Sequence, residues 1–150
     1  TIDNTSLELN ALKFACNASF SDCRRAVICA VASLIDLSRM GPSTSEILSI
    51  WSPLLSKFIH SPEDQVDLIR HLHSYLQANS ASMALLFHVL LPQLYKLDVL
   101  EDDSVLAWYE ETVAAQPEGE AYLYCRQIKG FVSWLQESDE DEEDESDEDD

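Results

Sequence analysis

The sequence has little glycine and proline and no closely spaced cysteine pair. Three Gly and five Pro in 150 residues are too few for the many turns of a β-rich fold. The four cysteines, Cys16, Cys23, Cys29 and Cys125, form no Cys-x-x-Cys motif. Their spacing favours reduced, mostly buried thiols in a cytosolic protein over a disulfide or metal framework.

Long apolar runs and catalytic motifs are also missing. No stretch of about 18 uncharged apolar residues and no signal-type N-terminus occurs, so we expect neither membrane insertion nor secretion. There is no glycine-rich phosphate loop, nucleophile elbow or His-Glu-x-x-His motif. His71 and His73 are two residues apart, which places them on different sides of a helix rather than on one metal-binding face. We therefore expect no metal, no cofactor and no covalent chemistry.

Negative charge is abundant and unevenly placed. The net charge is −19, and residues 137–150 contain 12 acidic residues and no basic one. Such a polyanion repels nucleic acid and anionic membranes and attracts basic protein segments. Because residues 138–150 offer nothing apolar to bury, we expect a disordered acidic tail after one helical domain over residues 1–137.

Apolar residues recur at helical spacing along almost the whole remaining chain. Cap and breaker residues predict the helix boundaries. The predictions are a first helix ending near Asn17, a second from an N-cap at Ser21 to Gly41-Pro42, a third from residues 43–45 with a possible bend at Pro53, a fourth from Ser61-Pro62, a fifth over about 81–96, and two more after Ser104 and from about Ala121.

Seven or so helices with short polar joints predict an all-α fold of stacked antiparallel helical hairpins. Helix starts near residues 21 and 62 indicate a unit of about 40 residues, which suits HEAT-type repeats. No repeat is visible as sequence similarity, so a compact helical bundle is the alternative.

Two segments combine aromatic with acidic residues, one over 98–111 and one over 131–137 that continues into the tail. Acids can steer a lysine-rich ligand while lysine stems pack on exposed edges of the two tryptophan rings. The competing interpretation is that Trp108 and Trp134 are core anchors. An exposed Lys–carboxylate pair is worth only about 0–1 kcal/mol. Useful affinity must therefore come from many pairs at once, or from an aromatic hot spot worth about 2 kcal/mol or more, and we expect the binding to depend strongly on salt. The predicted partner-binding residues are Glu101, Asp102, Asp103, Trp108, Tyr109, Glu110, Glu111, Trp134, Glu137, Asp139 and Glu140.

These segments resemble the aromatic–acidic boxes that end a family of translation factors: the epsilon subunit of eukaryotic initiation factor 2B, initiation factor 5 and some members of the 4G group. Other segments are similar to the epsilon-subunit domain in particular. They are residues 7–13, 17–20, 50–55 and 94–100. The resemblance thus covers nearly the whole chain and implies a HEAT-like domain.

The resemblance also implies a function. The epsilon domain promotes GDP release from initiation factor 2, whose beta subunit carries the lysine-rich segments and whose gamma subunit holds the nucleotide. The family's exchange face lies near the N-terminal helices, at an acidic residue after an Asn-x-x motif, which here matches Asn17 and Asp22. We expect this chain to be a segment of a longer protein. Other subunits of initiation factor 2B would bind through the N-terminal part of that longer protein.

Three alternatives bear on these residues. Asp22 in a first helical turn is also a routine partner of the helix dipole. A non-catalytic adaptor of the factor 5 or 4G type would use the same acidic end, and an unrecognised helical enzyme has no supporting group of residues.

Ser138 and Ser146 each precede Asp-Glu-Asp, a pattern typical of acidophilic kinase substrates, and phosphates there would strengthen attraction for lysine.

Overall fold

The computed structural model describes residues 1–79, 81–115 and 120–137, and every regular element in these residues is helical. The elements are α1 (Ile2–Ala15), α2 (Phe20–Leu34), the 3₁₀-helix η1 (Leu37–Arg39), α3 (Met40–Lys57), α4 (Pro62–Ala78), α5 (Ala81–Ala84), α6 (Phe87–Lys96), α7 (Asp102–Ala115) and α8 (Glu120–Gln127). Residues 129–137 are also helical, after a turn at residue 128. The predicted all-α class is confirmed. The predicted disordered tail, 138–150, lies outside the described residues.

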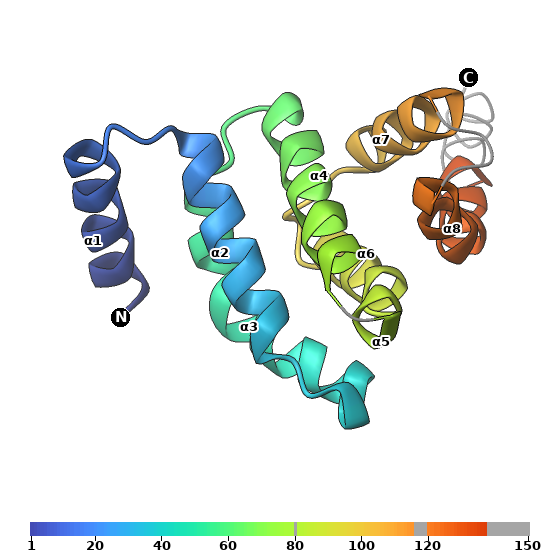
Figure 1. Cartoon of the computed structure of the whole chain (residues 1–150), viewed down its shortest axis with the longest axis horizontal. Coiled ribbons are helices and arrows are strands. Elements are labelled where there is room, and N and C mark those ends of the chain that lie inside the picture. Colours follow the sequence, from blue (N-terminus) through green and yellow to red (C-terminus); the bar gives the residue numbers. More distant parts are fainter. Residues whose placement is uncertain (80, 116–119, 138–150) are drawn as a thin grey trace, which may run out of the picture.

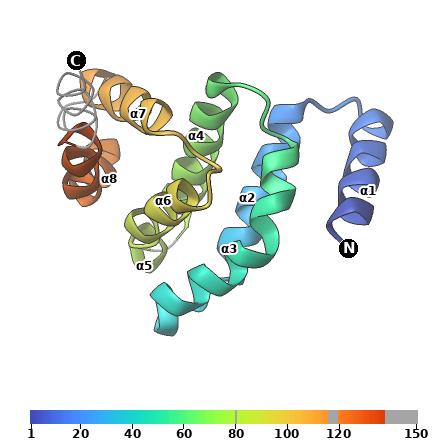
Figure 2. The ribbon, with the colours of Figure 1, turned by 180° about the vertical axis from the view of Figure 1, so that it is seen from behind.

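The helices stack as antiparallel pairs in two layers. In one layer α2 packs against α4 and α4 against α7, and in the other α3 packs against α6 and α6 against α8. Figure 1 shows α1 at one end of the stack and α7 with α8 at the other. Figure 2, seen from behind, brings α3 and α6 to the front. This arrangement is HEAT-like and not a compact bundle around a single axis.

The core runs between the two layers and excludes most of α1. Its largest fully buried side chains are Phe58, Phe87, Ile28, Leu48, Leu55, Leu68, Ile69, Leu72, Leu76, Leu86, Leu90 and Leu91. Burying each such side chain contributes about 1.5–3 kcal/mol. In α1, by contrast, Leu7 and Phe14 remain 68% and 77% exposed. A groove of about 290 Å³ lies where Leu9 of α1 faces α2 and α3, so α1 is the most loosely packed end of the stack.

The N-cap of the second helix lies two residues before the predicted cap. Ser19, not Ser21, is the N-cap: its hydroxyl accepts from the Asp22 N–H at 3.1 Å, and the Asp22 carboxylate accepts from the Ser19 N–H at 2.9 Å. This reciprocal pair satisfies two backbone donors that a helix start otherwise leaves free. The predicted position of Asp22 in the first turn is confirmed.

Other predicted boundaries are also wrong, among them the start of the third helix, which is Met40 and not residues 43–45. The second helix ends at Leu34, and Gly41-Pro42 lies in the first turn of α3, where proline costs no intrahelical hydrogen bond. The predicted fifth helix is divided into α5 and α6 by a turn at residues 85–86. The predicted start of α4 is confirmed, with Ser61 as its N-cap and Pro62 in its first turn.

Candidate functional site

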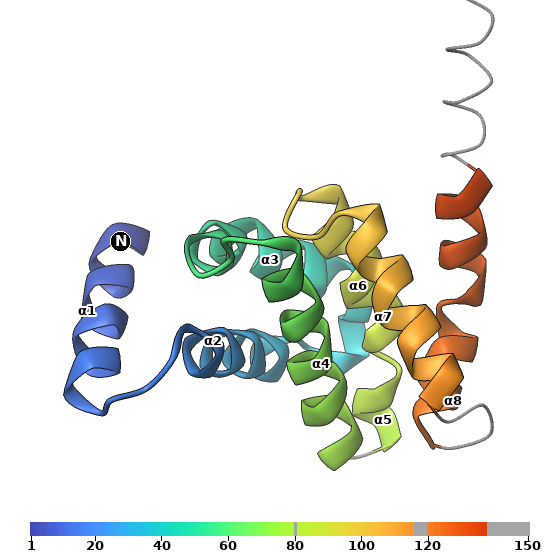
Figure 3. The ribbon, with the colours of Figure 1, turned by 90° about the horizontal axis from the view of Figure 1, so that it is seen from above.

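The predicted site residues lie at opposite ends of the stack. Asn17 and Asp22 flank the start of α2, whereas the aromatic–acidic segments form α7 and the helix at 129–137. Figures 1 and 3 show that α1 and α2 lie far from α7 and α8. The two groups therefore form two separate candidate surfaces. Asp139, Glu140, Ser138 and Ser146 lie outside the described residues.

In the first aromatic–acidic segment the tryptophan is a core residue. Trp108 is 2% exposed, and its ring lies 5.2 Å from Phe87 and 5.7 Å from His73, measured between ring centroids. Burial lowers the pKa of His73, which keeps a neutral imidazole in this cluster. The expectation of an exposed ring edge at Trp108 is wrong, because the acids of α7 lie on its outer face while its tryptophan packs inward.

In the second segment the tryptophan is accessible. Trp134 is 51% exposed, stacks on Phe131 at 6.1 Å and meets Tyr95 edge-on at 5.9 Å. These rings, with Pro92 and Lys96, line a pocket of about 310 Å³. Glu137 follows one turn later and is exposed. The aromatic hot spot predicted for this end is therefore offered by Trp134 alone of the two tryptophans.

The acids of α7 differ in how far they are already paired. Glu111 accepts two hydrogen bonds from one guanidinium nitrogen of Arg70, at 2.8 and 2.7 Å, which neutralises that carboxylate from within the domain. Glu101, Asp103 and Glu110 are exposed. The remaining predicted residues of this segment, Asp102 and Tyr109, are half-buried. A basic ligand would thus meet the first turn of α7 more readily than the turn at Glu111.

Asn17 has a defined backbone role at the end of α1. It adopts a left-handed conformation with φ 55°, which asparagine tolerates better than most residues. Its N–H donates to the Phe14 carbonyl at 3.3 Å, and the Ala18 N–H donates to the Lys13 carbonyl at 2.9 Å. This pair of bonds is a Schellman cap, so Asn17 sets the turn that places the start of α2.

Asp22 is exposed and held by its own helix start. Its hydrogen bonds with the backbone N–H and side chain of Ser19 lower the pKa of the carboxyl, so it is negatively charged at neutral pH. Among the described residues it makes no ion pair within 4 Å. The carboxylate is therefore both a capping group and a charge that a partner can reach.

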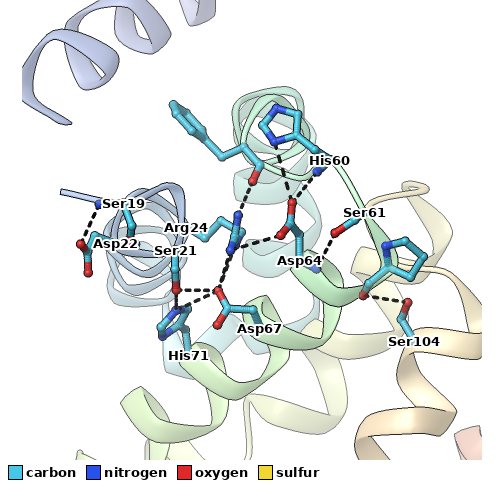
Figure 4. A network of polar contacts seen from close by, with 12 residues as sticks. Ser19, Ser21, Asp22, Arg24, His60, Ser61, Asp64, Asp67, His71 and Ser104 are labelled. Carbon is cyan, nitrogen blue, oxygen red and sulfur yellow. Dashed lines mark hydrogen bonds and ion pairs between the residues drawn. The ribbon is translucent and has the colours of Figure 1, made fainter. Parts of the chain in front are cut away.

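A buried polar network between α2 and α4 was not predicted. Figure 4 shows Arg24 at its centre, reaching from α2 to Asp64 and Asp67 of α4. Ser21, the predicted cap, instead donates to Asp67 at 2.7 Å and lies 2.8 Å from His71. An arginine between the apolar positions Cys23 and Val27 was the signal in the sequence. This network ties the helix that carries Asp22 to the centre of the stack.

The described residues contain no group of His, Cys, Asp or Glu arranged to hold a metal ion. His71 and His73 do face different surroundings, as their spacing predicted: one contacts Ser21 and Asp67, the other the aromatic core. The four cysteines are free thiols, with Cys16 exposed and Cys125 buried. The class that the fold defines is an all-α domain of stacked, HEAT-like helical pairs.

Within the part of the chain that the structure describes, no single helix is long and apolar enough to span a membrane. The bent pair Phe20–Leu34 and Leu37–Lys57 has the necessary length and apolar composition only when the two segments are taken together.

Comparison with known proteins makes this class specific. Residues 64–145 match the family model described as W2: eIF4-gamma/eIF5/eIF2-epsilon, and the chain belongs to this family of translation initiation factor domains. It is 33% identical over 143 residues to translation initiation factor eIF2B subunit epsilon of Schizosaccharomyces pombe and 30% over 153 residues to that of Dictyostelium discoideum, in each case covering 93% of this chain. The resemblance to the epsilon subunit is confirmed.

The match with other members is shorter. Human eIF5-mimic protein 1 is 30% identical over 94 residues, which cover 63% of this chain and 22% of that protein. The chain spans about a fifth of the length of its epsilon-subunit relatives, at 20% and 21%. The similarity to epsilon subunits thus includes nearly all of this chain, at both ends of the helical stack.

Proposed function

We propose that this domain promotes GDP release from initiation factor 2 and docks lysine-rich segments of that factor's beta subunit at its acidic C-terminal end. The observation that carries the proposal is the similarity to epsilon subunits over 93% of the chain, which includes the Asn17 cap and Asp22 as well as the aromatic–acidic helices. The names of those relatives support a role in translation initiation. The resemblance to the exchange domain supports the activity.

The separation of the two surfaces suits a tether and an exchange face. When a lysine-rich segment of the beta subunit is held at α7 and the helix at 129–137, the nucleotide-binding gamma subunit of the same factor stays at a high effective concentration near the exchange face. Exchange itself requires tighter binding to the nucleotide-free partner than to the GDP-bound partner, so that GDP affinity falls reciprocally. An exposed carboxylate such as Asp22 can contribute by competing for a phosphate-binding lysine or by disturbing the Mg²⁺ site. Phosphates on Ser138 and Ser146 would add charge to the tether.

The exchange role of Asp22 predicts how the wild type and three variants should rank in stimulated GDP release. Asp22→Asn removes the charge but keeps an acceptor for the Ser19 N–H, and it is expected to slow stimulated GDP release by about 10-fold or more, the loss of about 1.4 kcal/mol. Ser19→Ala breaks the same capping pair, costs about 1 kcal/mol of stability and leaves the charge of Asp22. This variant should therefore stimulate GDP release nearly as much as the wild type. Asp22→Glu should retain activity.

The measurement is release of labelled GDP from loaded initiation factor 2, with the domain in its full subunit and as the chain described here. Equal losses in Asp22→Asn and Ser19→Ala would mean that Asp22 acts only as a cap. Binding without any acceleration by the wild type in either form would favour the second candidate, a non-catalytic adaptor. The shorter match to eIF5-mimic protein 1 is the observation that supports this adaptor.

The tether predicts strong salt dependence. Exposed lysine–carboxylate pairs are worth about 0–1 kcal/mol each and are screened as the Debye length falls from about 10 Å at 0.1 M to about 3 Å at 1 M salt. Affinity for a lysine-rich beta-subunit segment should therefore fall steeply between these salt concentrations, as measured by fluorescence anisotropy. An affinity that does not change with salt would rule out the electrostatic tether.

A further inference from the structure

A small pocket lies where the first turn of α4 meets the first turns of α7. Its volume is about 210 Å³, and its lining residues are Pro62, Glu63, Val66, Asp103, Ser104 and Ala107. We call it the α4–α7 pocket. Figure 4 shows Ser104 of α7 beside the turn that begins α4, with its hydroxyl toward the Pro62 carbonyl. The pocket is distinct from that at Trp134, which lies between α6 and the helix at 129–137.

Apolar and acidic residues line this pocket together. Pro62, Val66 and Ala107 supply apolar surface, while Glu63 and Asp103 bring one exposed carboxylate from each helix. Among the described residues neither of these acids forms an ion pair within 4 Å. The pocket is therefore an apolar hollow with two uncompensated negative charges.

The cations of α2 and α4 near this junction are already committed. Arg24 bonds Asp67 and the Phe58 carbonyl and pairs with Asp64, and Arg70 bonds Glu111. Each helix N-terminus brings about half a positive charge, which is less than the charge of the carboxylate that its own first turn places in the pocket. The local field therefore favours a cationic ligand.

We propose that the α4–α7 pocket binds one lysine side chain of a basic protein segment, with the stem on Val66 and Ala107 and the ammonium between Glu63 and Asp103. A lysine has an apolar stem and a compact charge with three donors, which can serve two carboxylates on separate helices. Arginine's planar fork is better matched to a single carboxylate. The inference rests on the proposed lysine docking and assigns it a site that includes Glu63 and Val66, outside both aromatic–acidic segments.

The aromatic pocket at Trp134 is a poorer place for the ammonium. Its lining includes Lys96 and no acid, so a second ammonium there would meet a like charge. The rings of that pocket instead suit the apolar part of a ligand. The charged contact and the aromatic contact are thus divided between two pockets.

The test is binding of a labelled peptide with one run of lysines to the full chain, by fluorescence anisotropy at about 50 mM salt, where the Debye length exceeds 10 Å. Glu63→Gln with Asp103→Asn is expected to weaken binding about 5- to 20-fold. Glu8→Gln with Glu46→Gln removes two exposed charges from the N-terminal half and should weaken it less than about 2-fold. Ala107→Trp, which fills the pocket without changing charge, should weaken it about 5-fold or more, with Ala11→Trp as its exposed-site control.

A second readout is the preference between peptides with lysine and with arginine runs. The wild type should favour lysine, and the preference should disappear in the Glu63→Gln/Asp103→Asn variant. Equal losses in the pocket variants and their controls, with the wild type binding, would overturn the pocket and leave the docking function standing. A wild type that binds no lysine peptide would overturn the docking function itself. Circular dichroism of each variant confirms that it is folded.

Discussion

Trp108→Ala is expected to lower the free energy of unfolding by about 3–5 kcal/mol, the usual cost of truncating a buried aromatic side chain. The ring is 2% exposed and packs on Phe87 and His73, so its removal leaves a cavity among α4, α6 and α7. Trp134→Ala should cost about 1 kcal/mol, because that ring is 51% exposed and loses mainly its contacts with Tyr95 and Phe131. Urea unfolding followed by circular dichroism measures both changes.

Binding should separate the two tryptophans in the opposite way. Trp134→Ala removes the accessible ring. If Trp134 is the binding hot spot, this variant should bind a lysine-rich segment about 2 kcal/mol more weakly, or roughly 30-fold. Trp108→Phe keeps most of the buried volume, so a folded variant should bind as wild type. Loss of binding in Trp108→Phe with stability near that of the wild type would show that Trp108 contacts the ligand, against its position in the core.

The contrast between the tryptophans shows what the sequence could predict. Helical spacing located α7 and the helix at 129–137, and it identified Trp108 and Trp134 as possible anchors. It could not decide which ring is covered, because Phe87 and His73 come from other helices. Helical spacing determines which residues share a face of one helix. It does not say which faces other helices cover.

The helix boundaries show a second difference. The start of α2 could have been read correctly, since Ser19 followed three residues later by Asp22 resembles a capping box, but Ser21 competed as a cap of the same type. The end of α2 is set by contacts of the residues that follow it: the Asp36 N–H donates to Ser43 Oγ at 2.8 Å, and the Asp36 carboxylate caps η1. Gly41-Pro42 predicted a stop where the structure starts a helix.

The buried network at Arg24 was missed because its partners lie in another helix. An arginine on the apolar face of a helix predicts a buried partner, but the partners of Arg24 are 40 and 43 residues away in α4. Nothing in local spacing connects them. The stacking order of the helices is needed first, and the network then explains how α2 is attached to α4.

Arg24→Met is expected to destabilise the domain by about 2–4 kcal/mol. The side chain is 7% exposed, and its guanidinium donates to Asp67 at 3.0 Å and to the Phe58 carbonyl at 2.9 Å while pairing with Asp64 at 3.4 Å. Removing one partner of a buried ion pair usually costs about 3–5 kcal/mol. The estimate is lower here because the two carboxylates are 22% and 25% exposed and water can partly replace the cation.

The pH dependence of this loss follows from Asp67. Burial alone would raise the pKa of that carboxyl, but the hydrogen bonds from Ser21 and Arg24 and the charges of His71 and Arg24 outweigh burial, so the pKa is lowered from 3.8. A carboxyl with a lowered folded-state pKa stabilises above its unfolded pKa and loses that contribution as the pH falls through the folded value. The stability difference between wild type and Arg24→Met should therefore be full at pH 7 and shrink below about pH 4.

A double-mutant cycle with Asp67→Asn isolates the pair. If Arg24 acts mainly through Asp67, the double variant should lose about 0.5–3 kcal/mol less than the sum of the single losses, as measured by urea unfolding at pH 7. Arg25→Met, on the exposed side of the same helix, is the matched control and should cost less than about 0.5 kcal/mol. Additive losses would mean that the Phe58 carbonyl and Asp64 carry the interaction. A loss for Arg24→Met equal to that for Arg25→Met would contradict the network as the attachment of α2 to α4.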